Sequence, residues 1–417
     1  MNSFDSRLQH PALTRKAFLA TGAIAAFRLR APAAEPPALP AMDDVLRSGI
    51  ARRRIPGVCA AVAGPRNTLY SAAFGSRDAS GVPLRTDSIF AIASMTKAIT
   101  TAAALQLVEQ GKLDLSEPVV KHLPQLAGLE VLEGFDSADK PSLGPVKTPV
   151  TLRHLLTHTS GFCYDVWDQQ MFRYRSAHPA SPTSPPGPLM FQPGTRWQYG
   201  EGLDWTGRLV EAVTGATLED YFQERILRPL GMSDTSYLLP AAKFDRLVSG
   251  YRRLPSGDLV PDARHQPRRP REFSGGAGLY STAADYLVFL RMILNRGAGP
   301  DGVRVLKPET VESMLTNQIG GLTAGRMKSL RPAVSSDVDF QPGKEEKWGF
   351  GFLLNPVPYD GGRSAGSAAW AGIFNTFYWV DPKAGRCAVI LMQFLPFVDK
   401  EAIGLLNDFE TSVYRLL

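Results

Sequence analysis

The sequence predicts a protein of the α/β class, of the α+β type, in which helices flank an antiparallel β-sheet and a mostly helical domain is inserted. Strand-like apolar runs lie near the two ends of the 417-residue chain, and the residues between them combine short helical patterns with long loops. The runs form hairpins with flanking helices and show no regular βαβ alternation, which favours antiparallel pairing. No internal repeat is visible.

The first part of the chain supplies a helix, a hairpin and a second helix. A helical pattern over residues 42–54 ends before an Ile-Pro-Gly segment. Apolar runs at 58–63 and 68–74, separated by a Gly-Pro-Arg-Asn turn, predict two paired strands. A long helical pattern follows at 94–110, and Gly111 gives it the usual C-terminal stop.

The last part of the chain returns to the same mixture of helices and strands. A helix is expected over residues 283–295, and three apolar, β-rich runs follow at 350–354, 374–380 and 387–393. A helix over 400–414 closes the chain. These elements predict a discontinuous α/β domain made of residues 41–112 and 273–417, with a mostly helical insert domain at 113–272.

Residues 1–40 are predicted to be a signal-like segment and a linker. A basic start and a short apolar stretch ending at Phe27 resemble a twin-arginine export signal, and the Ala/Pro-rich residues 31–40 are typical of an extended linker. Because Arg28 and Arg30 follow the apolar stretch directly, a frayed amphipathic extension explains the pattern equally well. A cytoplasmic and an exported location therefore both stay open.

The composition excludes several classes of protein. Hydrophobic residues make up 44% and charged residues 21%, which is typical of globular domains and argues against disorder or a coiled coil. No apolar run reaches the roughly 18 residues that span a bilayer, so no membrane span is predicted. Three widely spaced cysteines cannot build a disulfide scaffold or a cysteine-rich zinc module.

Charged residues and histidines indicate neither a nucleic-acid partner nor a cofactor. The net charge is +6, but the arginines are scattered along the chain. The densest group is expected to be solvated at the surface and consists of Arg264, Arg268, Arg269 and Arg271. No HExxH or HxH pair occurs. His154 and His158 could share one helical face, but without an acidic neighbour a structural role is favoured. We expect no metal, and the sequence gives no indication of oligomeric state.

Two Ser-x-x-Lys segments offer a candidate nucleophile. Ser137 and Lys140 lie among glycine, aspartate and proline, which predicts a polar loop. Ser94 and Lys97 lie where an apolar run gives way to a helix, so both side chains can share one face in an apolar setting. A serine hydroxyl needs a base to take its proton, and a neutral lysine can do so. On this segment alone, a helix-start serine beside a snorkelling lysine is an equal alternative.

Ser364 is a rival, because Gly362–Gly366 spells the Gly-x-Ser-x-Gly elbow of α/β-hydrolases. That elbow requires a strand, a turn and a helix, with a histidine later in the chain. No histidine follows His265, and loop followed by strand is expected after Gly366. A catalytic role for Ser364 is therefore not favoured.

Three further segments strengthen the case for Ser94. Residues 151–161 (TLRHLLTHTSG) resemble a stretch common in serine β-lactamase-like hydrolases, and 193–200 (PGTRWQYG) resembles their tyrosine loop. Trp370-Ala371-Gly372 precedes a strand where class C β-lactamases and penicillin-binding proteins carry Lys-Thr-Gly. From Met42 to the C-terminus the chain resembles this superfamily, nearest to the family VIII carboxylesterases, and it is also similar to fungal statin acyltransferases.

The resemblance implies a β-lactamase/transpeptidase-like fold and an acyl-enzyme mechanism. It implies that Ser94 is the nucleophile and that Lys97 and Tyr199 together act as the general base. The amides of Ser94 and Ile373 would form the oxyanion hole. The substrate-binding residues would be Trp370, Ala371, Gly372 and Asn375. Trp370 would be an aromatic at the rim of the site, and a strand-turn amide is an equal alternative for Asn375.

Two departures from β-lactamases bear on the substrate. Tyr199-Gly200-Glu201 lacks the amide that contacts a β-lactam side chain, and Trp370 replaces the lysine that would pair with a β-lactam carboxylate. We therefore expect a serine carboxylesterase acting on small, short-chain neutral esters. Acyl transfer to an alcohol, or weak β-lactam hydrolysis, would use the same site. A non-enzymatic binding module of this fold would lack one of the three catalytic residues, and none is missing.

Overall fold

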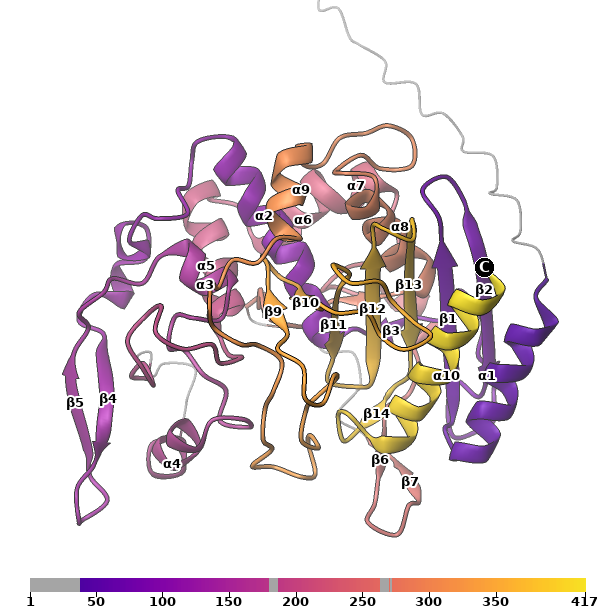
Figure 1. Ribbon diagram of the computed structural model, residues 1–417, viewed down its shortest axis with the longest axis horizontal. Coiled ribbons are helices and arrows are strands. Elements are labelled where there is room, and N and C mark those ends of the chain that lie inside the picture. The colour runs from indigo at the N-terminus through magenta and orange to yellow at the C-terminus, as the bar shows by residue number, and fades with distance from the viewer. Residues whose placement is uncertain (1–37, 180–186, 263–269, 271) are drawn as a thin grey trace, which may run out of the picture. The chain divides into compact units, whose positions relative to one another are not determined.

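A seven-stranded sheet organises the computed structural model, which describes residues 38–179, 187–262, 270 and 272–417 (Figure 1). The strand order is β2-β1-β13-β12-β11-β10-β9, and every neighbouring pair is antiparallel. The strands are β1 (Gly57–Ala63), β2 (Thr68–Gly75), β9 (Lys347–Trp348), β10 (Leu353–Leu354), β11 (Ala368–Gly372), β12 (Thr376–Asp381) and β13 (Arg386–Leu391). The predicted antiparallel sheet with flanking helices is confirmed.

Strands from the first and last parts of the chain pair inside this sheet. Strand β1 pairs with β13, from Cys59 opposite Leu391 to Ala63 opposite Cys387. All seven residues of β1 are buried, as expected for a central strand covered on both faces. The pairing joins segments that are more than 300 residues apart, so neither segment can complete the sheet alone.

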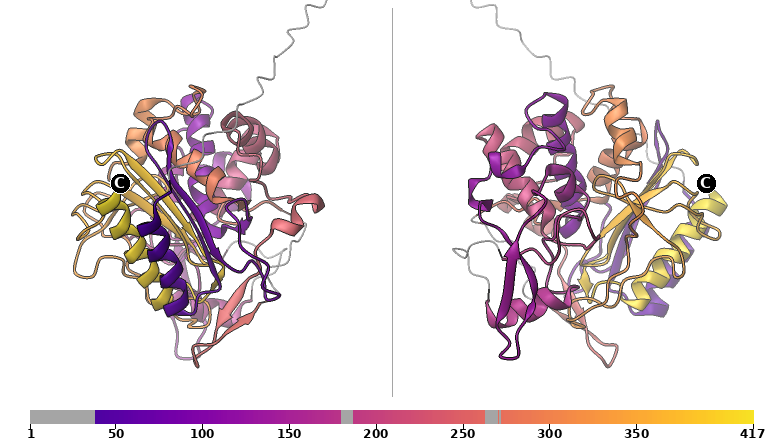
Figure 2. Two further views of the ribbon diagram at one scale, coloured as in Figure 1. Left: turned by 90° about the vertical axis from the view of Figure 1, so that its right-hand side faces the viewer. Right: turned by 60° about the vertical axis from the view of Figure 1, so that its left-hand side comes forward.

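Helices cover both faces of the sheet. Helices α1 (Pro40–Arg53) and α10 (Lys400–Leu416) pack together on one face, and α8 (Ala283–Leu294) packs on the other, against β1, β12 and β13 (Figure 2). A Cβ atom at Gly49 would lie 2.5 Å from Leu405 Cδ1, so α1 meets α10 at a glycine. The expected helices over 42–54, 283–295 and 400–414 are α1, α8 and α10.

The remaining elements lie between and beside these layers. Helix α2 (Thr96–Glu109) follows the 3₁₀ turn η1 (Ala93–Met95). The other helical elements are η2 (Val119–Lys121), η3 (Pro124–Leu126), α3 (Leu152–Leu156), α4 (Gln169–Ala177), α5 (Gly202–Thr214), α6 (Leu218–Phe222), η4 (Gln223–Leu227), α7 (Arg228–Leu230), η5 (Ala241–Arg246) and α9 (Pro308–Met314). The smaller sheets contain β3 (Phe90–Ala91), β4 (Glu130–Phe135), β5 (Pro141–Pro145), β6 (Tyr251–Arg253), β7 (Leu259–Pro261), β8 (Tyr280–Ser281) and β14 (Phe394–Leu395).

Two expectations about strands need revision. The run expected at 350–354 is a strand only at β10, because Gly351 has a φ of +78° and interrupts an extended backbone. The β4–β5 hairpin was not expected, and it projects from the helical region (Figure 1). The described residues from 38 to 417 form one compact unit, and the predicted boundaries near 113 and 272 stay a prediction.

Some sequence features lie outside the described residues, namely the signal-like segment and the arginines at 264, 268, 269 and 271. Within the described part of the chain, no helix is both long and apolar enough to cross a membrane.

Candidate active site

Ser94 lies in η1, at the start of the long buried helix α2. Ala93 has a φ of +45°, a left-handed conformation that costs a non-glycine residue energy and that the surroundings must hold in place. The backbone of Leu279 does so, because its carbonyl accepts from the Ile92 amide at 3.0 Å and its amide donates to Thr96 Oγ1 at 3.3 Å. Ser94 is partly exposed between buried neighbours, so it remains reachable from solvent.

Lys97 lies one helical turn after Ser94 and is only 1% exposed. Its Nζ atom contacts Ser94 Oγ at 3.3 Å, as the three-residue spacing predicts. It also donates to the Gly276 carbonyl at 2.7 Å and to the Tyr164 hydroxyl at 3.2 Å. A buried amine in contact with a partly exposed serine is one arrangement that can activate a serine hydroxyl.

Tyr199 completes the group of three predicted catalytic residues. Its side chain is 2% exposed, and its ring centroid lies 4.9 Å from Lys97 Nζ. The Trp370 indole N–H donates to the Tyr199 hydroxyl at 3.3 Å. Tyr199 lies three residues before the start of α5 at Gly202, in a loop where a Cβ at Gly200 would overlap the Phe162 carbonyl. Segments more than 100 residues apart in sequence therefore bring the lysine and the phenol together.

The end of β11 lies against the Ser94 segment. A Cβ atom at Gly372 would overlap both the Ile92 carbonyl oxygen and Thr376 Oγ1, so only glycine fits at this approach. Ala371 is buried beside it, and Ile373 is partly exposed. This approach places the predicted oxyanion-hole residues Ser94 and Ile373 on neighbouring segments. Their role in stabilising an oxyanion stays a prediction.

Two residues predicted to bind substrate have mainly structural contacts. Trp370 is 3% exposed and therefore does not lie at a rim; its ring packs 4.9 Å from that of Tyr199 and 4.8 Å from that of Trp348. Asn375 is fully buried, and its amide donates to the carbonyls of Phe394 at 2.9 Å and Pro396 at 2.8 Å. These contacts support the strand-turn alternative for Asn375, while substrate contact by either residue stays a prediction.

A second tyrosine, which was not predicted, contacts Lys97. Tyr164 donates its hydroxyl proton to Asp204 at 2.7 Å while its oxygen accepts from Lys97. Burial, together with the nearby Asp204 carboxylate, raises the pKa of Tyr164 well above its ordinary value, so this phenol keeps its proton. Tyr164 and Asp204 are not part of a motif with a fixed spacing, so the only signal in the sequence was that each lies close to a motif.

The rival serines lie in different surroundings. Ser137 is exposed in the turn of the β4–β5 hairpin, which confirms a polar turn. Ser364 lies in a loop before β11, where its amide donates to Asp381 at 2.7 Å. The strand-turn-helix geometry of a hydrolase elbow is therefore absent at Ser364, as the sequence indicated.

The histidine pair has a structural arrangement. His154 belongs to a capping box with Thr151 at the start of α3. His158 lies beyond the end of α3 with a φ of +56°, so the two do not share a helical face. The ring of His158 packs 4.7 Å from Tyr199, and its Nδ1 accepts from the Gly200 amide at 3.3 Å. Among the described residues no cluster of three or more metal-ligating side chains occurs.

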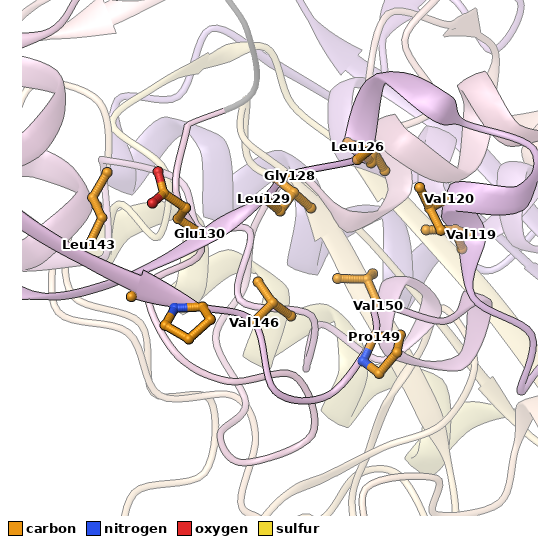
Figure 3. Close-up of a pocket in the computed structure, with 13 residues that line it drawn as sticks. Val119, Val120, Leu126, Gly128, Leu129, Glu130, Leu143, Val146, Pro149 and Val150 are labelled. Carbon is orange, nitrogen blue, oxygen red and sulfur yellow. The ribbon is translucent and has the colours of Figure 1, made fainter.

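A large apolar pocket lies away from these residues. It has a volume of about 710 Å³ and lies between η2, η3 and the β4–β5 hairpin (Figure 3). Its lining includes Val119, Leu129, Leu143 and Val146, and neither Ser94, Lys97 nor Tyr199 takes part.

Comparisons with known proteins agree with this fold. The family model described as Beta-lactamase matches residues 42–410. The chain is 34% identical to lovastatin esterase of Penicillium rubens, over 90% of this chain and 98% of that protein. It is 33% identical to monacolin J acid methylbutanoyltransferase of Aspergillus terreus, over 92% of this chain and 97% of that protein.

Solved structures give the same result. A mutant of simvastatin synthase from Aspergillus terreus has a TM-score of 0.77 at 32% identity, covering 90% of this chain and 94% of that one. EstCE1, a hydrolase with promiscuous acyltransferase activity, has a TM-score of 0.68 at 22% identity over 89% and 97% of the two chains, which supports the fold alone. The chain therefore belongs to the Beta-lactamase family, within the superfamily of serine hydrolases and acyltransferases that share this fold.

Proposed function

We propose that the protein is a carboxylesterase that hydrolyses small neutral esters through an acyl-enzyme on Ser94. The observation that carries this proposal is the 3.3 Å contact between Ser94 Oγ and the buried Nζ of Lys97. Tyr199 lies beside the same amine and supplies a second group that can hold the serine proton. Because two interacting groups share that proton, they act as one coupled base.

The proposed reaction has two steps. Ser94 Oγ attacks the ester carbonyl while its proton passes to the Lys97–Tyr199 pair, and the negative oxygen that forms is stabilised by the amides of Ser94 and Ile373. The alcohol leaves with the proton from the pair, which produces the acyl-enzyme. Water then gives a proton to the same pair as its oxygen attacks the acyl carbon, and the pair passes that proton to Ser94 Oγ as the bond to the acyl group breaks, which releases the acid and restores the free serine.

Two side chains support a neutral substrate. Trp370 provides no positive charge where β-lactamases have a lysine, and its indole N–H is already donated to Tyr199. Glu201 replaces an amide-bearing residue, and burial followed by the charge of Asp204 raises its pKa to about 7. An anionic substrate would therefore meet no cation at Trp370 and a partly ionised acid at Glu201. A preference for esters with a short acyl chain is also part of the proposal.

Acyl transfer is the second candidate function, because one relative is a methylbutanoyltransferase and a solved relative is a synthase. In that case an alcohol, rather than water, would attack the acyl-enzyme. The two reactions are separated by supplying an ester together with a competing alcohol and measuring both products. A transferase forms mainly the new ester, whereas an esterase forms mainly the free acid.

The direct test uses single substitutions assayed on p-nitrophenyl butyrate. Ser94→Ala, Lys97→Ala and Tyr199→Phe should each lose nearly all turnover, while Ser137→Ala and Ser364→Ala should keep it. Nitrocefin measured alongside reports any β-lactam hydrolysis. Full esterase activity in Ser94→Ala would overturn the proposal.

A further inference from the structure

One carboxylate organises both groups that hold the catalytic lysine. Apart from Ser94, the hydrogen-bond acceptors of Lys97 Nζ are the Tyr164 hydroxyl oxygen and the Gly276 carbonyl. These acceptors come from distant segments of the chain, yet hydrogen bonds lead from each of them to the side chain of Asp204.

The first connection runs through Tyr164. The phenol donates its only proton to Asp204 Oδ2 at 2.7 Å, so its oxygen presents a lone pair to Lys97 at 3.2 Å. Without the carboxylate, the hydroxyl is free to rotate and to point its proton at the amine. Asp204 therefore fixes the direction in which Tyr164 offers its lone pair.

The second connection runs through the segment Ser274–Gly276. Ser274 donates its hydroxyl proton to Asp204 Oδ1, and the Gly276 amide donates to Ser274 Oγ at 3.0 Å. A Cβ atom at Gly276 would overlap the Asp204 carboxylate, so glycine lets this backbone lie against the acid. The Gly276 carbonyl then reaches Lys97 at 2.7 Å. Thr100 Oγ1 donates to the Gly275 carbonyl at 2.7 Å and holds the same segment against α2.

We propose that Asp204 is a positioning residue that, through Tyr164 and Ser274, directs Lys97 toward Ser94 and supplies the negative charge that balances the ammonium. This inference rests on the proposed function, because it assigns the support of the same catalytic pair. Each acceptor fixes one N–H direction of the amine, which leaves the third direction for Ser94. Asp204 accepts from Tyr164 and Ser274, and no hydrogen bond joins it to Ser94, so we assign it an indirect effect on the reaction.

The charge of Asp204 acts on proton transfer with a defined sign. One phenol oxygen bridges Asp204 and Lys97, so their separation falls within the roughly 4–6 Å over which a charge shifts a titration. A negative charge near the Lys97–Tyr199 pair makes the pair hold its protons more tightly. Removing that charge makes the pair lose a proton at lower pH. The acidic limb of kcat/KM, where the base becomes available, should therefore move to lower pH.

Other titratable groups lie near Lys97 and Asp204, and their effects on the pH profile must be separated from that of the Asp204 charge. His158 and Tyr199 lie beside Lys97, and Glu201 and Tyr237 interact with Asp204. Asp204 and Ser274 also line a pocket of about 600 Å³, whose other charged or titratable members are His122, Arg208, Glu211 and Glu272. Burial raises the pKa of Glu201 to about 7, so its titration must be removed before a shift of the acidic limb is assigned to Asp204.

The experiment measures kcat and kcat/KM against pH for the full-length protein and its variants on p-nitrophenyl butyrate. Asp204→Asn keeps the shape and an acceptor but removes the charge, so kcat should fall about 10-fold and the acidic limb should move down by about one pH unit. Tyr164→Phe and Ser274→Ala remove one connection each but keep the charge, so kcat should fall while the limb stays. The profiles are repeated in a Glu201→Gln background, which removes the titration of Glu201.

Glu211→Gln is the matched control. Glu211 lies on α5 two turns after Asp204, its carboxylate accepts from the Leu218 amide at 2.8 Å, and it has the same change from acid to amide. It should leave both kcat and the limb unchanged. Asp204→Glu restores the charge and should return the limb to the wild-type position.

The outcomes separate this inference from the proposed function. The inference is overturned if the acidic limb of kcat/KM in Asp204→Asn stays at the wild-type pH, both alone and in the Glu201→Gln background, whatever the kcat of the variant. If Asp204→Asn does not fold, unchanged kcat in both Tyr164→Phe and Ser274→Ala overturns it instead. Ser94 is tested separately by its reaction with a fluorophosphonate, which needs no ester turnover. An active Ser94→Ala variant overturns the proposed function, whereas an inactive one beside an unaffected Asp204→Asn overturns this inference alone.

Discussion

The chain contains two Ser-x-x-Lys segments with the same spacing and opposite surroundings. Lys97 is 1% exposed and contacts Ser94, a backbone carbonyl and a phenol. Lys140 and Ser137 are exposed at the β4–β5 turn, where water surrounds both side chains. The comparison teaches that spacing only makes a serine–lysine contact possible. Burial and the direction of the lysine's other hydrogen bonds decide whether the contact has chemical consequences.

The largest expected effect compares the two lysines directly. Lys97→Ala removes one of the two residues of the proposed general base and should lower kcat on p-nitrophenyl butyrate by at least about 10³-fold, in the range of losing a general base. Lys140→Ala should change kcat by less than about two-fold, because exposed surface substitutions are usually near neutral. Equal losses in the two variants would remove the distinction between the segments.

The next effect tests the close approach of β11 to the Ser94 segment. Gly372→Ala places a methyl group on the Ile92 carbonyl, so the Ser94 segment and β11 must move apart. A misplacement of about 1 Å costs on the order of 10²-fold in rate, and we expect a loss of that size in kcat. Gly321→Ala is the control, since no atom lies within 4 Å of its Cβ position. Wild-type kcat in Gly372→Ala would show that the approach is not needed.

A smaller effect tests the indole that donates to Tyr199. Trp370→Phe keeps a ring in the cluster but removes the N–H that donates to the phenol oxygen at 3.3 Å. A hydrogen bond to a group that carries charge during reaction contributes about 1.5–3 kcal/mol, so kcat should fall about 10-fold or more. In the control Trp197→Phe, the lost N–H has no hydrogen-bond partner among the described residues. Its kcat should fall much less than that of Trp370→Phe.

The smallest effect concerns stability rather than rate. Burial, followed by the charge of Lys97, holds the pKa of His158 well below its ordinary value near 6.5. The unfolded chain therefore binds a proton that the folded chain does not, and this lowers stability as pH falls below about 6.5. His158→Asn does not titrate, tolerates the φ of +56°, and keeps an acceptor for the Gly200 amide.

The measurement is the melting temperature of wild type and His158→Asn at pH values from 7.5 to 5. The wild type should lose more degrees over this range than the variant, even if the variant melts lower throughout. Parallel curves for the two proteins would mean that His158 takes no part in the loss.

Local patterns predicted much of the fold. The helices at 42–54 and 283–295 have amphipathic or buried periodicity with clear stops, and the first hairpin has a strong turn between apolar runs. The β4–β5 hairpin was missed because its second strand contains two prolines and a glycine, which are more typical of loops than of strands. Pairing of β1 with β13 has no local signal, because it depends on contacts between distant segments.

The candidate site was predicted unevenly for the same reason. Ser94 and Lys97 are joined by a three-residue spacing, which the sequence displays directly. Tyr164 and Asp204 were missed because each acts through a contact between separate segments. Trp370 was expected at a rim and is buried, because its surroundings come from Trp348 and Tyr199 rather than from its own strand.

The central claim, that Ser94 carries the acyl group, is tested most directly by mass spectrometry of a rapidly quenched reaction with p-nitrophenyl butyrate. The account predicts one butyryl group on the tryptic peptide 86–97, with no acylation of the peptide that contains Ser137. It also predicts that the modification disappears in Ser94→Ala. A butyryl group on any other residue during turnover, or turnover by Ser94→Ala at the wild-type rate, would contradict the account.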